Sequence, residues 1–156
     1  MSSKSLMDAT PQLRVFASTL IMKAKQDLNL TIIVTSVSRT FNEQVALFAQ
    51  GRVRLNEVNI LRKKVDYKPI IQSENRIVTW TFLSKHVVWP GELSHAIDIV
   101  ILDKNGKASW DVKADVNDDN LPDYIQVGAL AKTIDPMVKW GGDFVDDKDY
   151  PHFQIT

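Results

Sequence analysis

The chain has 156 residues, of which 44% are hydrophobic and 24% are charged, a composition typical of a soluble globular protein. This composition excludes collagen-like and disordered chains, and the absence of cysteine excludes disulfides, thiol catalysis and cysteine-based zinc sites. Nineteen basic and nineteen acidic residues give no net charge, which argues against a general attraction to nucleic acid or to an anionic membrane.

The first fifty residues predict a helix, a strand and a second helix. Apolar residues recur at helical spacing over residues 10–28, and the β-branched run at 30–34 favours a strand. Thr40 and Glu43 have the spacing of a capping box, in which each side chain caps a backbone N–H of the other residue. This pair predicts a helix that begins there and ends at Gly51.

The middle of the chain contains a polar and basic segment at 53–76, which we interpret as an insertion with a short helix near 55–64. Strands are predicted at 77–82 and, from an almost wholly apolar run, at 96–102. No segment has the twenty or so consecutive apolar residues that a membrane-spanning helix needs, so we expect no membrane insertion.

The last third of the chain predicts a hairpin, a helix and a terminal strand. Asn105-Gly106 is a hairpin turn signal, with Trp110 on the returning strand. A helix is predicted at 121–134, and a short strand begins at Phe153. This order of elements predicts an α+β fold in which helices flank a short antiparallel sheet within a single small domain.

Three residues have types and surroundings that point to chemistry. Asp98 lies in the apolar strand, where a buried carboxylate must bind a cation or pair with an arginine, unless it occupies an exposed strand end. His152 follows Pro151 in a predicted turn, and Asp149 is near enough to flank the same centre, although a surface turn is the alternative. His86 taken alone is typical of a structural histidine. Together, two imidazoles and one carboxylate form a known type of catalytic zinc site.

Four segments, taken in order, resemble the zinc D-Ala-D-Ala carboxypeptidase / L-alanyl-D-glutamate endopeptidase family, and bacteriophage endolysins in particular. The segments are Ser36–Arg52, Val78–His86, Ala96–Ile99 and Trp140–Phe153. Each motif is weak alone, but their order is specific, and the resemblance covers residues 30–156. It implies the Hedgehog-like fold of this family and one catalytic domain over residues 1–156, without a separate cell-wall-binding domain.

The resemblance also assigns roles to residues of this chain. It implies that zinc is held by His86, Asp98 and His152. It makes Asp149 the general base, and Arg39 the group that stabilises the oxyanion or clamps a substrate carboxylate, with a salt bridge to a neighbouring acid as the alternative for Arg39. Ser84 is expected to hydrogen-bond substrate, with a simple turn hydroxyl as the alternative.

The chain departs from the family between His86 and Asp98, where an insertion at about 87–94 lengthens the spacer. His95 in this stretch is therefore an alternative first ligand. On an extended strand, however, residues 95 and 98 point to opposite faces, which disfavours joint ligation.

The function implied by the resemblance is that of a phage-type endolysin, which hydrolyses the L-alanyl-D-glutamate bond of peptidoglycan stem peptides for host lysis. The alternatives are a D,D-carboxypeptidase acting on D-Ala-D-Ala and a non-catalytic, zinc-stabilised wall-binding module. Because no signal peptide is recognised, we expect synthesis in the host cytoplasm, release by a holin-like permeabiliser, and action at the wall or periplasm. A monomer is expected.

A second metal site is predicted after Trp110, where the spacing of oxygen ligands resembles a calcium loop. The ligands would be Asp115, Asn117, Asp119, the Leu121 carbonyl and Asp123. Asn120 replaces the usual glycine, and Gln126 stands where a bidentate glutamate is usual. The alternative is an acidic turn that caps the following helix.

Overall fold

Strand β2 (Ala96–Leu102) is the centre of a five-stranded antiparallel sheet in this computed structural model, which describes residues 2–156. The strand order is β1-β2-β5-β4, and β3 pairs with the C-terminal end of β2, beyond the residues that pair with β5. The other strands are β1 (Ile32–Ser36), β3 (Ala108–Ser109), β4 (Lys139–Trp140) and β5 (His152–Gln154). The family's expected architecture, a short antiparallel sheet flanked by helices, is confirmed.

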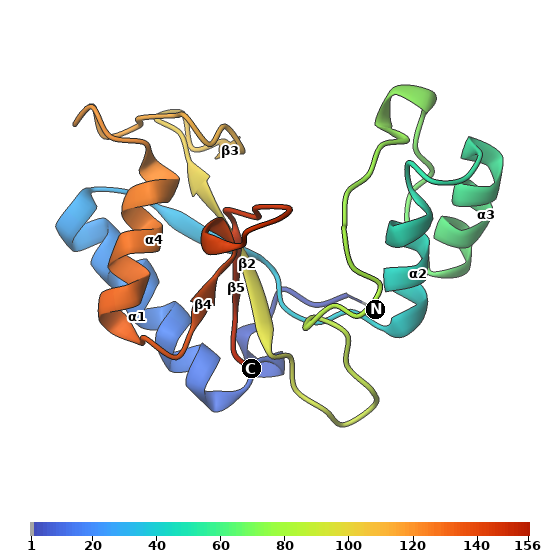
Figure 1. The fold of residues 1–156 in the computed structure, drawn as a ribbon, viewed down its shortest axis with the longest axis horizontal. Coiled ribbons are helices and arrows are strands. Elements are labelled where there is room, and N and C mark those ends of the chain that lie inside the picture. Colours follow the sequence, from blue (N-terminus) through green and yellow to red (C-terminus); the bar gives the residue numbers. More distant parts are fainter. Residues whose placement is uncertain (1) are drawn as a thin grey trace.

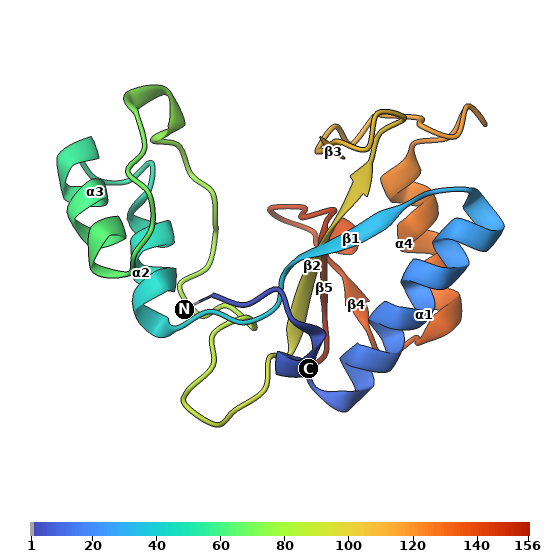
Figure 2. The same cartoon turned by 180° about the vertical axis from the view of Figure 1, so that it is seen from behind.

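Two pairs of helices lie on different sides of this sheet (Figures 1 and 2). Helices α1 (Pro11–Leu28) and α4 (Asp123–Ile134) pack together against one face. Helices α2 (Phe41–Ala49) and α3 (Leu55–Lys64) form a separate lobe, joined to the sheet by the segments on either side of it. In the part of the chain that the structure describes, no helix is both long enough and apolar enough to span a bilayer.

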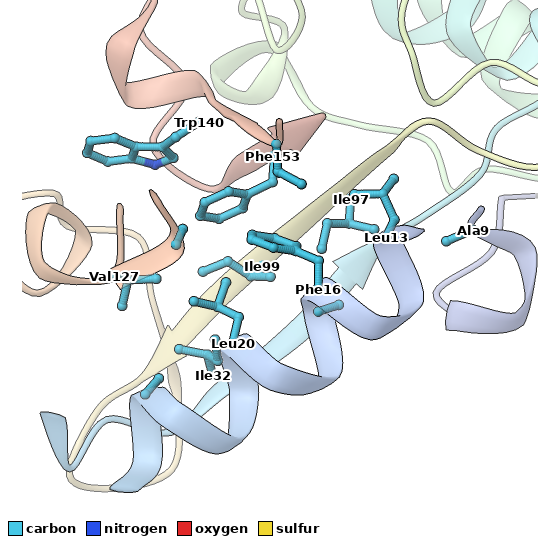
Figure 3. Packing of buried hydrophobic residues seen from close by; sticks show 14 of the residues in the cluster. Ala9, Leu13, Phe16, Leu20, Ile32, Ile97, Ile99, Val127, Trp140 and Phe153 are labelled. Carbon is cyan, nitrogen blue, oxygen red and sulfur yellow. The ribbon is translucent and has the colours of Figure 1, made fainter. Parts of the chain in front are cut away.

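The hydrophobic core lies between the sheet and helices α1 and α4 (Figure 3). Leu13 and Phe16 of α1 are buried, and the Phe16 ring lies 5.5 Å from that of Phe153 on β5. On β2, Ile97 and Ile99 belong to this core. Because successive strand residues point to opposite faces, the residue between them, Asp98, points away from the core.

The predicted helices are confirmed because their signals are local. Helix α1 matches the expected apolar spacing, and α3 lies at 55–64 as predicted. The capping box of α2 has both of its hydrogen bonds, from Glu43 N to Thr40 Oγ1 and from Thr40 N to the Glu43 carboxylate.

The strand predicted at 77–82 is wrong, since the structure has no strand there. This segment runs beside the α2–α3 lobe and is held by side chains rather than by a neighbouring strand (Figure 1). Gln44 donates to the Thr79 hydroxyl and to the Thr81 carbonyl. A β-prone run becomes a strand only where it pairs with a partner strand, and among the described residues no strand of the sheet pairs with this segment.

Other boundaries shift by one or two residues. The strand predicted at 30–34 runs over 32–36, because Leu30 N donates to Ala24 O and so completes the C-terminus of α1. The returning strand of the hairpin ends at Ser109, immediately before Trp110. The predicted turn is confirmed, with Gly106 at a left-handed φ of 75°.

Candidate functional site

Asp98 on β2 and His152 on β5 are paired residues of two neighbouring strands, and His86 joins them from the segment before β2. His86 Nε2 lies 3.1 Å from Asp98 Oδ1, and His152 Nδ1 lies 2.9 Å from the same oxygen. The two ring nitrogens are 3.3 Å apart. All three candidate ligand atoms lie within 4.8 Å of one another, so this His-Asp-His cluster has the spacing of a metal centre.

The outer nitrogen of each imidazole is held by a hydrogen-bond acceptor. His86 Nδ1 lies 2.7 Å from the Val37 carbonyl oxygen, and His152 Nε2 lies 2.9 Å from Gln154 Oε1. Each contact therefore places the ring proton on the outer nitrogen, which leaves a lone pair on the inner one. Two such lone pairs and a carboxylate oxygen converge on one point, and this donor set fits a zinc ion.

The electrostatics of the cluster favour an ionised Asp98. Burial alone would raise its pKa, but the charges and hydrogen bonds of the two imidazoles hold that pKa well below its ordinary range. For His152, burial alone would lower the pKa, but the hydrogen bond to Asp98 raises it above its ordinary value. In the absence of a metal ion, a proton on His152 thus partly neutralises the carboxylate.

Arg39 contacts the other oxygen of Asp98. Its Nη2 donates to Asp98 Oδ2 and to Ser36 Oγ, each at 3.2 Å, while Nη1 donates to Gln44 Oε1 at 3.2 Å. The two Asp98 oxygens are thereby divided between the imidazoles and the guanidinium. The sequence placed Arg39 at the site and offered a salt bridge to a neighbouring acid as its alternative role. The structure shows that this acid is Asp98, so the contact fixes the orientation of a candidate ligand.

Asp149 lies beside the cluster on the turn that precedes β5. Its backbone N donates to Gly141 O at 3.0 Å, and its carbonyl accepts from His152 N at 3.1 Å. A β-carbon at Gly141 would collide with that carbonyl, so this turn requires glycine there. Partial burial, followed by repulsion from Asp98, raises the pKa of the Asp149 carboxyl. A carboxylate of raised pKa beside a metal centre is suited to act as a general base.

A cleft of about 530 Å³ brings the predicted site residues together. Its lining includes all six of them: Arg39, Ser84, His86, Asp98, Asp149 and His152. His95 lies outside the cleft, with an exposed side chain and a backbone that bonds to Lys85 and Ile155. The structure therefore places His86, and not His95, with the other two candidate ligands. A larger hollow of about 630 Å³ beside α3 contains none of the six.

Sequence reasoning missed Gln44 and Gln154, which hold Arg39 and His152. Gln44 is fully buried. Its position within an apolar helix, one residue after the capping box, is the signal that could have found it. Gln154 lies two residues after His152 along β5, so both side chains point to the same face of the sheet.

The carboxylates of the predicted calcium loop accept hydrogen bonds from the loop's own backbone N–H groups. Asp115 accepts from the N–H groups of Asp119 and Asn120, and Asp123 accepts from Val116 N. Asn120 has a left-handed backbone, with φ of 68°. Among residues 2–156, the His-Asp-His cluster is the only group of three His, Asp or Glu side chains with metal-site spacing. The structure thus gives the calcium prediction no support.

Comparison with known proteins agrees with this site. A family model described as D-alanyl-D-alanine carboxypeptidase matches residues 78–155, a range that contains the three candidate ligands and Asp149. The peptidoglycan L-alanyl-D-glutamate endopeptidase CwlK of Bacillus subtilis (strain 168) is 29% identical over 136 residues. The match covers 85% of this chain but only 65% of CwlK, so the chain spans just under two thirds of that relative.

The solved structures include one of the same fold. The crystal structure of the Serratia marcescens L-Ala D-Glu endopeptidase ChiX matches with a TM-score of 0.58 and 19% sequence identity. The match covers 100% of this chain and 89% of ChiX. At this identity, the likeness establishes a shared fold.

Proposed function

Because the chain belongs to the D-alanyl-D-alanine carboxypeptidase family of peptidases, we propose that it is a zinc-dependent endopeptidase that hydrolyses the L-alanyl-D-glutamate bond of peptidoglycan stems. The observation that carries the proposal is the His-Asp-His cluster in one cleft with Asp149. A binding module needs a metal for its fold but has no use for a base beside it.

The residues of the cleft divide the chemistry among them. His86, Asp98 and His152 would hold zinc, which supplies a Lewis acid for the scissile carbonyl. The Asp149 carboxylate accepts a proton from the attacking water and returns it to the leaving amine. Because its pKa is raised, this carboxylate is a stronger base than an ordinary aspartate. Arg39 orients Asp98 through its hydrogen bond, and it also lines the cleft, where it can meet an oxyanion or a substrate carboxylate.

The names of the relatives support cleavage of the L-alanyl-D-glutamate bond, since CwlK and ChiX are both described as endopeptidases of that bond. The description of the family model favours the D,D-carboxypeptidase alternative. Mass spectrometry of digested muropeptides separates the two reactions. The proposal predicts new N-terminal D-glutamate, loss of this product with a chelator, and its return with zinc. Release of free D-alanine alone would assign the carboxypeptidase reaction instead.

We also propose that the enzyme acts as a phage-type endolysin, which a holin-like permeabiliser releases from the host cytoplasm to the wall. Its resemblance to endolysins over residues 30–156 supports this role. Turbidity measurements on bacteria that produce the protein in the cytoplasm test the role, with and without a co-expressed pore. Lysis is expected only with the pore. Lysis without the pore, or none with it, would contradict this role.

A further inference from the structure

Two exposed tryptophans line the same cleft as the His-Asp-His cluster but do not belong to that cluster. Trp80 and Trp110 are each 56% exposed, whereas Trp140 is packed into the core. Within residues 2–156, neither of the two exposed rings stacks on another aromatic ring, and neither indole N–H donates a hydrogen bond. By contrast, Trp89 stacks on Phe41, and Trp140 donates to the Tyr150 carbonyl. Leaving two large apolar faces in water has a cost that a ligand would offset.

The backbone on which each of these rings is mounted is fixed. The residues on both sides of Trp80 are tied to the α2–α3 lobe, through the bonds from Gln44 to Thr79 and Thr81. Trp110 directly follows β3, where the Ser109 carbonyl accepts from the Tyr124 hydroxyl at 2.9 Å. Trp80 thus lies on the segment that returns from the α2–α3 lobe and Trp110 lies just after β3, so two different parts of the fold contribute these rings to the cleft. A tryptophan side chain has only two rotatable bonds, so on such a backbone it loses little conformational entropy when a ligand packs on it.

The proposed substrate carries a sugar that would lie close to the His-Asp-His cluster. In peptidoglycan, L-alanine is the first residue of the stem and is joined to the lactyl group of N-acetylmuramic acid. The alanine and the lactyl group each span roughly 3.5 Å when extended, so the sugar ring begins about 7 Å from the scissile carbonyl. A cleft that cuts this bond therefore has a pyranose against its wall, and the C–H face of a pyranose packs on the face of an indole.

We propose that Trp80 and Trp110 form a saccharide subsite that binds the N-acetylmuramyl residue of the stem being cut. The inference rests on the proposed function, because only cleavage next to L-alanine puts the sugar in this cleft. The enzyme then takes glycan-linked stems in preference to free stem peptides. The two tryptophans are specificity residues, since the metal ligands and Asp149 are the same for both substrates.

Binding to a catalytically silent protein tests the subsite without turnover. In the zinc-loaded Asp149→Asn protein, calorimetry compares a GlcNAc-MurNAc-tetrapeptide with the free tetrapeptide. The glycan-linked ligand is expected to bind about tenfold more tightly, the effect of roughly 1.4 kcal/mol of stacking. Adding Trp80→Ala or Trp110→Ala should remove most of this difference and leave the affinity for the free peptide within twofold. Trp89→Ala is the matched control, because Trp89 is also exposed but lies outside the cleft.

Kinetics with the wild-type protein separate failure of the subsite from failure of the function. The kcat/KM for the glycan-linked stem should exceed that for the free tetrapeptide by about tenfold, and Trp80→Phe should keep most of this preference. Equal cleavage and equal binding of both ligands would overturn the subsite and leave the endopeptidase assignment standing. An equal loss on both ligands in the Trp→Ala proteins would also overturn it. Tighter glycan binding without any cleavage would uphold the subsite and refute the proposed function.

Discussion

Asp98 contacts both histidines of the His-Asp-His cluster and also Arg39. One of its oxygens meets both imidazoles and the other meets Arg39. Its apolar neighbours in the sequence predicted that this carboxylate binds a cation or pairs with an arginine, because a buried carboxylate without a partner is too costly. The sequence did not reveal that a metal ligand and an arginine share the same carboxylate. That arrangement depends on β1, β2 and β5 meeting in one register.

The hydrogen bond from His152 to Gln154 predicts a measurable effect on metal affinity. Gln154→Ala should weaken zinc binding by about 10- to 100-fold, because the imidazole loses the acceptor that fixes its tautomer and orientation. Competition with a chromogenic chelator measures the change. Gln12→Ala is the matched control, since Gln12 is exposed, its side chain donates to Asp135, and neither residue lines the cleft. Equal zinc affinity in the Gln154→Ala and Gln12→Ala proteins would refute the positioning role.

The raised pKa of His152 predicts how the stability of the metal-free protein depends on pH. The proton that His152 shares with Asp98 contributes stability fully below the unfolded pKa of about 6.5, and this contribution is lost as pH rises through the higher folded pKa. The melting temperature of the chelated protein should therefore fall as pH rises from 6 to 8.5. In the zinc-loaded protein the ion replaces the proton, so this fall should vanish.

Thermal unfolding followed by circular dichroism at several pH values checks this prediction. His152→Gln should flatten the profile of the metal-free protein. His95→Gln should leave the profile as it is, because His95 is exposed and outside the cluster. A melting temperature that rises with pH in the chelated protein would refute the assigned coupling between His152 and Asp98.

The elements differ in how far local sequence determines them. The capping box of α2 was predicted correctly because its two hydrogen bonds join residues three apart. The strand expected at 77–82 failed because strand formation depends on a distant partner, and this segment instead bonds to Gln44 and to the guanidinium of Arg52. The second case matters for the site, since the same segment presents Trp80 to the cleft.

The start of α2 provides a test at this scale. Thr40→Val should lower the free energy of unfolding by about 1 kcal/mol, because the hydroxyl that accepts from Glu43 N is lost. Thr10→Val at the start of α1 is the matched control. Its hydroxyl is buried without a hydrogen-bond partner, so its removal should cost little or even stabilise. Urea unfolding of both variants measures the difference, and equal losses would show that the capping bonds contribute nothing.

At the scale of the whole molecule, the cleft lies between the sheet and the segment that returns from the α2–α3 lobe. Arg39 and His86 reach it from the connections between the lobe and the sheet, while Asp98 and His152 come from the sheet itself. The sequence predicted which residues would meet, through their order and family resemblance. It did not predict the two-sided cleft, because the position of a lobe relative to a sheet is encoded in contacts between residues far apart in the chain.

The central claim is that this cleft contains a catalytic metal centre and that Asp149 is the general base. The most direct measurement compares wild type with Asp149→Asn for zinc content and for the products released from a defined muropeptide. The claim predicts that Asp149→Asn keeps one zinc ion and its fold but loses at least about 100-fold in cleavage of the L-alanyl-D-glutamate bond. A zinc-loaded Asp149→Asn protein that cleaves this bond as fast as wild type would contradict it.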